Sequence, residues 1–337
     1  MNVEQLRQTF PDEESCRVFF ESIIWPEGPI CPHCRSQYAW RLKSTKVRPG
    51  LHECGDCHRQ FTVTTRTPFH GTKLSLWIWI QVMYSLICSS KGASSVAIAT
   101  WVGVSQKTAW KMLHALRALM AVHQAALPLL QGVVELDEKY LGGKPRYKHG
   151  VKHKRGHGTS KACIATVIQR QGPVRTRLIA NDSVADLRPF ITQTVDPRAD
   201  LMSDEHSAYQ TIGRDFASHQ SVRHGQKEFA RGAVHNNTAE SFHATLERAK
   251  FGVYHWMSKL HLPLYTAEAV FHWNQRTPEK KTILRGKNQG QTRTIMKRLP
   301  ILEQFKNLLR LAPFCQVRRT KNSGIRIIPG PLPSFGL

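Results

Sequence analysis

The spacing of apolar side chains changes along the chain, and these changes predict where helices and strands lie. Between residues 73 and 125 apolar positions recur at helical intervals, as at Ile80, Met83 and Ile87. From Val133 onward they form short strand-like runs separated by turn residues. The expected strands are residues 133–141, 162–169, 174–180, 200–204 and 218–223.

Helical patterns separate or follow the later strands. The expected helices of this part are residues 184–195, 205–212, 236–250 and 260–276. An order of three strands, helix, strand, helix, strand and helix is that of a ribonuclease H-like α/β domain with a mixed sheet. In such a sheet the first three strands form a meander, and residues 171–173 are the expected hairpin turn between the second and third.

Two helices joined by a glycine-containing turn are expected before the strands. Residues 94–100 form the first helix, with Gly103 in the turn. Ser105 is the N-cap of a second helix that runs to about Met120. This is the plan of a helix-turn-helix, whose second helix contacts bases with its first residues, while an ordinary helical bundle is the alternative. The candidate DNA-contacting residues are Gln106, Lys107 and Lys111.

Two Cys-x-x-Cys pairs precede the helical region. Cys31 and Cys34 form the first pair, Cys54 and Cys57 form the second, and 19 residues separate the pairs. This spacing is typical of a four-thiolate zinc ribbon with a hairpin between the pairs. Because four protein ligands leave no open coordination position, we expect the Zn²⁺ to be structural. Free thiols or a redox pair are the alternatives, and either would make the two spacings a coincidence.

The chain has 337 residues and a formal net charge of +24, so we expect several domains and a polyanionic partner. Nucleic acid is the usual partner of so basic a protein, and an anionic membrane surface is the alternative. No run of about 18 apolar residues predicts a membrane span, and the first residues lack a signal-peptide pattern. We therefore expect a cytoplasmic protein whose cysteines are thiols or metal ligands.

Two further segments are strongly basic. Residues 144–161 contain Lys and Arg but no Asp or Glu, and a loop that contacts DNA phosphates is the expected role, with a solvated loop as the alternative. Residues 277–337 are expected to be a DNA-contacting extension, with an unstructured tail as the alternative. The candidate phosphate contacts in the first segment are Lys144, Lys152, Lys154 and Arg155.

Three carboxylates fall at positions that the expected fold brings together. Asp137 lies on the first strand, Asp204 ends the fourth, and Glu240 lies on a helix that can pack across the same edge. The first and fourth strands are neighbours in this topology, so the two aspartates approach each other. Carboxylate oxygens suit hard cations, and three of them can hold two Mg²⁺ or Mn²⁺ ions for phosphoryl transfer.

These acids also have alternative roles. Asp204 can cap the helix that follows it, and Asn237 with Glu240 has the spacing of a capping box. Glu247 lies seven residues after Glu240 on the same helix face, and is therefore a rival third acid. Glu135 shares the strand face of the first aspartate.

Three segments of the sequence resemble a known family. VELDEKYLGGK, SDEHSAY and HNNTAESFHATLERAKFGVYH are similar to the DDE transposases of a bacterial insertion-sequence family related to the eukaryotic Merlin transposons. The resemblance covers about residues 15–276, including the zinc ribbon and the helix-turn-helix. It implies a ribonuclease H-like domain that cuts and joins DNA at transposon ends, with Asp137 and Asp204 as the first two acids.

The resemblance leaves the third acid open between Glu240 and Asn237, because relatives use Glu or Asn in this block. Many relatives have Lys where this chain has Glu247. The implied partner is double-stranded DNA, both of the terminal inverted repeats and of the target. Cutting at paired ends further implies a homo-oligomer on that DNA, in the bacterial cytoplasm with the nucleoid.

We expect four parts of the chain and one function. The function is a transposase that binds insertion-sequence ends and catalyses metal-dependent cleavage and strand transfer. A non-catalytic zinc-ribbon DNA-binding protein, such as a decayed transposase or a regulator, and a nuclease without strand transfer are the alternatives. The expected parts are an N-terminal helix and zinc ribbon (1–65), a helix-turn-helix-like region (66–127), a catalytic domain (128–276) and a basic extension (277–337).

Overall fold

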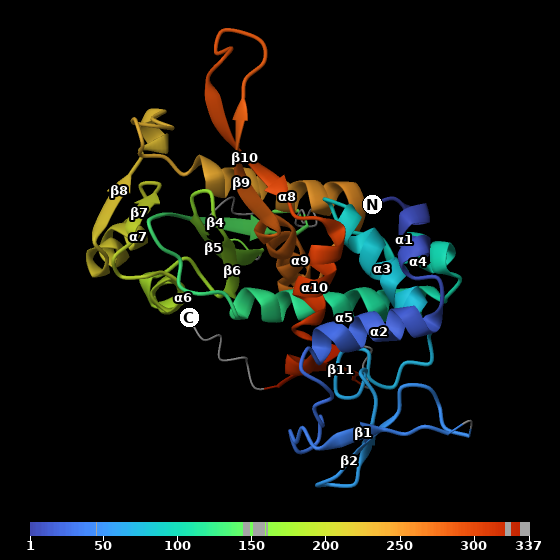
Figure 1. Ribbon diagram of the computed structural model, residues 1–337. Helices are drawn as coiled ribbons and strands as arrows, with labels where there is room; N and C mark the ends of the chain where they lie inside the picture. The colour runs from blue at the N-terminus through green and yellow to red at the C-terminus, as the bar shows by residue number, and fades with distance from the viewer. Residues whose placement is uncertain (45, 144–148, 151–158, 160, 321–324, 331–337) are drawn as a thin grey trace. The chain divides into compact units, whose positions relative to one another are not determined.

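The computed structural model describes residues 1–44, 46–143, 149–150, 159, 161–320 and 325–330 (Figure 1). The chain divides into two compact units: unit 1 comprises residues 1–126 and 300–337, and unit 2 comprises residues 127–299. The limits of the four expected parts remain predictions. Nowhere in the described ranges does a helix combine the length and the apolar character needed to cross a bilayer.

Two helices open unit 1 where a single N-terminal helix was expected. They are α1 (Val3–Thr9) and α2 (Glu13–Ile24). Asp12 accepts the N–H of Ser15, whose hydroxyl in turn accepts the N–H of Asp12, and α1 has the same kind of capping box at Asn2. These reciprocal bonds satisfy N–H groups of the first turn that have no partner within the helix.

A three-stranded antiparallel sheet follows, in the order β1-β2-β3. β1 (Ala39–Arg41) and β2 (His52–Cys54) form the expected hairpin between the two cysteine pairs, and β3 (Gln60–Phe61) pairs with β2. The Phe61 ring packs in a small apolar cluster with Trp25. So small a core stabilises a sheet weakly by itself, which is why cross-linking by a metal is expected here.

Longer helices continue unit 1: α3 (Leu76–Cys88), α4 (Ser95–Val102) and α5 (Gln106–Ala125). Gly103 ends α4 in the left-handed region, at φ 71°, and the Ser105 hydroxyl accepts the N–H of Thr108 to cap α5. The turn and the cap lie where the sequence predicts them. α5 continues past its expected end at Met120, since no Gly or Pro interrupts the following turn.

The last part of the chain also folds into unit 1. It forms α10 (Ile301–Leu309), the 3₁₀ turn η4 (Ala312–Phe314) and an antiparallel pair of β11 (Cys315–Arg319) and β12 (Ile325–Pro329). On α10, Phe305 and Leu308 are fully buried. The alternative of an unstructured tail is therefore wrong for this segment, while residues 331–337 lie outside the described ranges.

Unit 2 contains a mixed sheet in the order β6-β5-β4-β7-β8 (Figure 1). Its strands are β4 (Val133–Leu141), β5 (Ala162–Gln169), β6 (Val174–Ile179), β7 (Asp200–Ser203) and β8 (Ser218–Ser221). The first three strands pair antiparallel as a meander, whereas β7 pairs parallel with β4 and β8 pairs parallel with β7. This order confirms the ribonuclease H-like arrangement, with the first and fourth strands adjacent.

Helices cover both faces of this sheet. Side chains alternate between the faces along a strand, so Leu136 and Val167 pack with α6 and α7 on one face. Ile164 and Ile168 pack with α8 and α9 on the other face. The longer helices of unit 2 in the described ranges are α6 (Val184–Thr194), α7 (Ser207–Ile212), α8 (Asn237–Ala249) and α9 (Leu262–Asn274).

A hairpin of β9 (Arg276–Thr282) and β10 (Thr292–Arg298) ends unit 2. Most of its residues are exposed. The segment 277–337, expected as one extension, is thus divided by the structure between the two units.

Candidate active site and metal centre

Asp137 lies within β4, on the sheet face that α8 covers. Its Oδ1 accepts the N–H of Glu138 at 2.8 Å, and its Oδ2 lies 3.2 Å from Nδ1 of His243 on α8. The other ring nitrogen of His243 lies 2.9 Å from the hydroxyl of Thr166, which is the partner of Asp137 in the β4–β5 register. Both ring nitrogens therefore have a partner, and His243 holds the carboxylate in one orientation.

His243 is a functional residue that was not predicted from the sequence. It is buried and lies on α8 three residues after Glu240, so the two side chains occupy adjacent positions on the helix surface. A histidine one turn after a candidate acid, on the apolar side of an amphipathic helix, was the available signal. Without the strand register, nothing in the sequence connects it to Asp137.

Asp204 follows directly after β7, which pairs in parallel with β4. Burial raises the pKa of Asp204 above its ordinary value, and the nearby charge of Asp137 raises it further. The two aspartates are therefore close enough to interact, as predicted. The Oδ1 of Asp204 accepts the N–H of His206 at 3.0 Å, but His206 is itself the N-cap of α7, so the helix-cap alternative for Asp204 is wrong.

Glu240 lies in the first turn of α8 and is half exposed. Its Oε1 is 4.0 Å from Nε2 of His224, which comes from the 3₁₀ turn η2 (His224–Gln226). The His224 charge also acts on Asp204, where it opposes the rise in pKa. His224 therefore lies beside both acids. Asn237, the alternative third ligand, is the exposed first residue of α8.

The three predicted acids do not form one tight cluster. Across the described ranges, groups of three or more His, Cys, Asp or Glu with ligand atoms within 4.8 Å of one another are the ribbon cysteines and one other set, which includes none of Asp137, Asp204 and Glu240. The assignment of the three acids to one metal site therefore remains a prediction.

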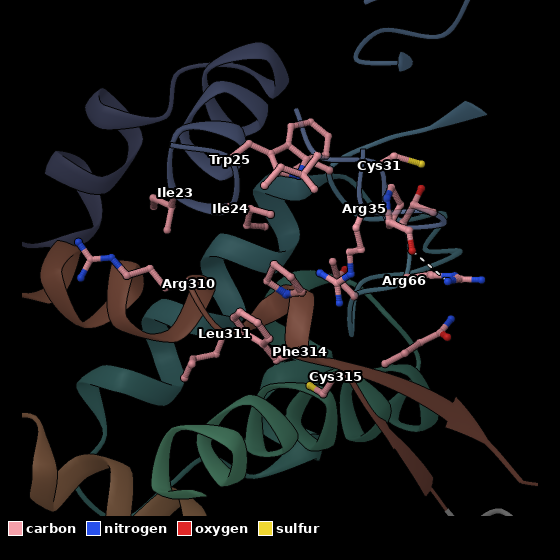
Figure 2. Close-up of a pocket in the computed structure, with 18 of the residues that line it drawn as sticks. Ile23, Ile24, Trp25, Cys31, Arg35, Arg66, Arg310, Leu311, Phe314 and Cys315 are labelled. Carbon is pink, nitrogen blue, oxygen red and sulfur yellow. Dashed lines mark hydrogen bonds between the residues drawn. The ribbon is translucent and has the colours of Figure 1, made fainter. Parts of the chain in front are cut away.

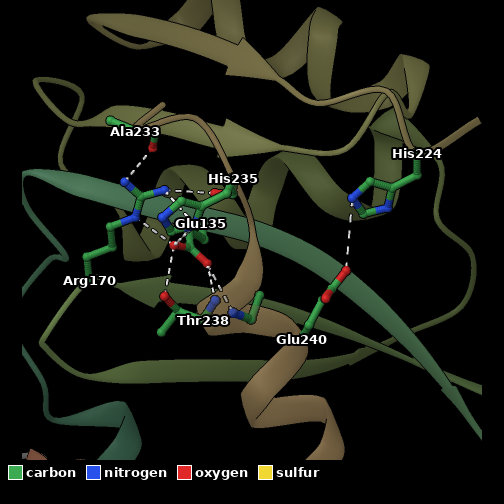
Figure 3. Close-up of polar contacts among 8 residues, drawn as sticks. Glu135, Arg170, His224, Ala233, His235, Thr238 and Glu240 are labelled. Atoms are coloured by element: carbon green, nitrogen blue, oxygen red, sulfur yellow. Dashed lines mark hydrogen bonds and ion pairs between the residues drawn. The ribbon is translucent and has the colours of Figure 1, made fainter. Parts of the chain in front are cut away.

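Glu135 is a fully buried carboxylate at the start of α8 (Figure 3). Its Oε2 accepts the backbone N–H groups of Thr238 and Ala239 at 2.8 and 3.1 Å, and its Oε1 accepts the Thr238 hydroxyl at 2.9 Å. Arg170 donates its Nε to Oε1 at 2.6 Å. Glu135 lies on β4 but caps the N-terminus of α8 in place of an N-cap side chain. This is the end of the helix where the helix dipole favours negative charge.

This arrangement corrects two interpretations of the sequence. The N-cap of α8 is Asn236, which makes no side-chain capping bond, so Asn237 and Glu240 do not form a capping box. Glu135 shares the strand face of Asp137 as expected, but donors from α8 and Arg170 engage both of its oxygens. It therefore has a structural role in the described fold.

Glu247, the rival third acid, forms an ion pair with Lys139 of β4 at 2.9 Å. Both side chains are partly exposed. An acid that is paired in this way is a weaker candidate for a metal ligand than Glu240.

The second set of clustered ligand atoms is Glu138, Asp182 and His206. The Tyr209 hydroxyl donates to Glu138 at 2.6 Å, and Nε2 of His206 lies 3.5 Å from Asp182. Burial raises the pKa of Glu138, and the charge of Asp137 adds to that rise. Because neighbours along a strand point to opposite faces, this set lies across the sheet from Asp137 and is a hydrogen-bonded network within the fold.

The four cysteines of the ribbon meet as predicted. Their Sγ atoms lie within 4.8 Å of one another, with 3.6 Å between Cys31 and Cys57 and 3.4 Å between Cys34 and Cys54. Tetrahedral Zn–S bonds of about 2.3 Å require Sγ–Sγ distances of about 3.8 Å, so the cluster is consistent with a structural Zn²⁺. A backbone N–H of Cys57 lowers the pKa of the Cys54 thiol to about 6, which favours the thiolate.

Some of the predicted DNA contacts fall within the described residues. Gln106, Lys107 and Lys111 are exposed at the start of α5, and the amide of Gln106 donates to the Ser95 hydroxyl of α4 at 2.8 Å. Their contact with DNA remains a prediction. The candidate phosphate contacts Lys144, Lys152, Lys154 and Arg155 lie outside the described residues.

Two parts of the chain match known domain families. Residues 129–274 match the ISXO2-like transposase domain, and residues 11–60 match a transposase zinc-ribbon domain. The first match contains all the candidate acids, and the second contains all four ligand cysteines. Together the two matches cover more than half of the chain.

A protein from a transposable element and two crystal structures are similar to this chain. The chain is 28% identical over 271 residues to the uncharacterized protein in transposable element ISH50 of Halobacterium salinarum, covering 77% of this chain and 90% of that protein. Crystal structures of the Mos1 strand transfer complex and of a pre-cleavage Mos1 transpososome are 12% and 11% identical, with TM-scores of 0.23 and 0.22. The aligned regions cover 59% and 56% of this chain, and 76% and 73% of the two Mos1 chains. At such TM-scores the fold assignment rests on the strand order and not on this likeness.

Proposed function

We propose that this chain, which matches an ISXO2-like transposase domain and a transposase zinc-ribbon domain, binds insertion-sequence ends and catalyses metal-dependent DNA cleavage and strand transfer. The observation that carries this proposal is the approach of Asp137 and Asp204 on adjacent parallel strands of a ribonuclease H-like sheet. The net charge of +24 supports a nucleic-acid partner.

The chemistry of these side chains fits a hard divalent cation. Asp137, Asp204 and Glu240 offer only oxygen donors. Burial raises the pKa of Asp204 and the charge of Asp137 adds to that rise, and a bound cation would oppose both effects. In this proposal the three acids hold Mg²⁺ or Mn²⁺, with Asn237 as the alternative third ligand. When bound, such ions activate the attacking water or 3′-hydroxyl and stabilise the leaving oxygen.

The surrounding residues position these acids. His243 and Thr166 hold Asp137 in one orientation, and Glu135 fixes the start of α8 against β4. In this proposal Glu240, whose exposed side chain lies beside His224, turns towards the two aspartates when the metal binds. We assign His243 and Glu135 as positioning residues, because neither is free to act on DNA.

DNA-end binding is assigned to other parts of the chain. The exposed start of α5, the zinc ribbon and the basic segment 144–161 supply the positive and polar groups that contact DNA. Concerted cutting of two transposon ends requires an active site for each, so the active form in this proposal is a homo-oligomer on DNA.

A cleavage and strand-transfer assay on DNA that carries the element's own ends tests the assignment. In Mg²⁺ or Mn²⁺, Asp137→Asn and Glu240→Gln should each lower the cleavage rate by at least about 10²-fold, the scale for losing one essential charged group. DNA-end binding, measured by gel shift, should stay unchanged, since these side chains lie outside the DNA-binding parts.

Glu247→Gln is the matched control, because it removes an acid from the same helix without touching the proposed ligands. Normal cleavage is expected. Full cleavage activity in Glu240→Gln, together with loss of cleavage in Asn237→Ala, would identify Asn237 as the third ligand. Full activity in Asp137→Asn would overturn the catalytic proposal, and end binding without cleavage by the unmodified chain would favour the non-catalytic DNA-binding alternative.

A further inference from the structure

Unit 1 contains a large cavity (Figure 2), whereas the candidate active site belongs to unit 2. Its volume is about 1050 Å³, at the upper end of the range of about 300–1,000 Å³ for small-ligand sites. The walls come from the end of α2, the first cysteine knuckle, residues 63–67, α10, η4 and the final strands. Segments from opposite ends of the sequence therefore enclose one space.

Part of the cavity lining is apolar and partly aromatic. Ile24 and Leu311 are buried in it, while Trp25 and Phe314 are half-buried and keep part of their ring surface at the cavity. The Trp25 ring is fixed by edge-to-face contacts with Phe61 and with the His52 ring. The two aromatic side chains come from the C-terminal end of α2 and from η4.

The cavity lining is also cationic. Among the described residues that line the cavity, none is Asp or Glu. Glu303 of α10 forms ion pairs with Lys306 and Arg310, at 3.4 and 3.9 Å. Arg66 donates to the Pro32 carbonyl at 2.9 Å, and no ion pair joins Arg35, Arg66 or Arg318 to a carboxylate within the described ranges. The lining cations are Arg35, Arg66, Lys306, Arg310 and Arg318.

Aromatic rings and guanidinium groups without a carboxylate partner, together in one cavity, are the chemistry that binds a nucleotide through its base and its phosphate. Bases in a duplex are covered on both faces by their neighbours, so only an unpaired base can stack on these rings. An acidic peptide would satisfy the cations, but its carboxylate side chains offer no planar ring to stack on the aromatic side chains.

We propose that this cavity binds unpaired nucleotides of a DNA strand, next to the duplex that the same unit binds. The proposal rests on the DNA-binding part of the proposed function and adds a single-stranded subsite to it. It requires no catalysis, so its test is independent of the candidate acids.

Fluorescence anisotropy with the full-length, zinc-loaded chain tests the proposal. The probes are a blunt duplex of the element's own end and the same duplex with a short oligothymidylate overhang. The overhang should tighten binding by about 5- to 150-fold, the contribution of one base stacked on an aromatic ring. Phe314→Leu, which keeps an apolar side chain but removes the ring, should abolish this gain and leave affinity for the blunt duplex unchanged.

A matched pair of charge variants separates the cavity from general electrostatics. Arg318→Gln in the cavity lining should reduce the gain from the overhang, whereas Lys91→Gln, an exposed cation of the same unit outside the cavity, should leave it intact. Free thymidine monophosphate should compete with the overhang, and Phe314→Leu should weaken this competition too. That result would show that a free nucleotide binds the cavity through the same contacts.

Three results would overturn the proposal. The first is equal binding of blunt and overhang duplexes. The second is a gain from the overhang that survives both Phe314→Leu and Arg318→Gln. The third is displacement of the overhang by polyglutamate but not by the mononucleotide, which would assign the cavity to an acidic peptide. Binding of neither duplex would overturn DNA-end binding itself, a result distinct from these three.

Discussion

At the residue scale, Asp204 is a partly buried acid whose raised pKa makes the stability of the fold depend on pH. Because its pKa is raised in the folded state, the folded chain holds that proton to higher pH than the unfolded chain, whose Asp titrates near 3.8. Stability therefore falls as pH rises through this window, and the loss persists at neutral pH. Asp204→Asn should raise the free energy of unfolding at pH 7 by up to about 1 kcal/mol, the scale of a half-exposed charge interaction.

Urea denaturation of unit 2 within the full chain, at pH 7 and near pH 3, measures this effect. Near pH 3, where the unfolded carboxyl is also largely protonated, the advantage of the variant should shrink. Added Mg²⁺ should stabilise the unmodified chain more than the variant. A variant that is less stable than the parent at pH 7 without metal would contradict this account.

Glu135 is the second residue whose role is electrostatic, and here the charge is paired. Removing one partner of a buried ion pair destabilises a protein by about 3–5 kcal/mol, and Glu135→Gln also turns an amide towards the N–H donors of α8. We expect a loss of about 3 kcal/mol in urea denaturation, together with slower cleavage, since α8 carries Glu240. Glu247→Gln breaks only the partly exposed pair with Lys139 and should cost about 1 kcal/mol or less. Equal losses in the two variants would refute the capping role of Glu135.

At the element scale, the zinc ribbon is the part least able to fold by itself. Its strands have two or three residues each, and its apolar cluster is small. We expect about one Zn²⁺ per chain in metal analysis, and loss of ribbon structure on chelation while the sheet of unit 2 stays folded. Cys54→Ser should have the same effect as chelation. Amide hydrogen exchange measures whether the ribbon is folded. A ribbon that stays folded in a metal-free preparation would exclude a structural zinc.

At the scale of the whole molecule, the charge of +24 governs binding to DNA. If about 6–10 phosphates are contacted, affinity should fall by about 10³- to 10⁵-fold between 50 and 200 mM salt. Replacing Lys152, Lys154 and Arg155 by Ala should weaken binding to all sequences alike and flatten the salt slope, because phosphate contacts position a protein without reading bases. Anisotropy titrations over that salt range measure both effects, and a salt-independent affinity would point to another kind of partner.

Local patterns in the sequence determined most of the elements. The helical spacing before residue 126, the strand runs from Val133 and the turn at residues 171–173 all depend on neighbours along the chain, and the structure contains these elements, although α5 ends at Ala125 and not near Met120. The same holds for the cysteine spacing, since two short knuckles set which thiols can meet. The strand order then brought Asp137 and Asp204 to adjacent strands.

Only the tertiary structure decided what each polar side chain does. Glu135 caps a helix that begins 102 positions later, and His243 meets Asp137 through a strand register that no local pattern encodes. The end of the chain folds back onto unit 1 and encloses a cavity with α2 and the ribbon. Propensity and spacing act over a few residues. Burial, ion pairing and charge compensation depend instead on which distant segments pack together, and that packing is defined only in the folded structure.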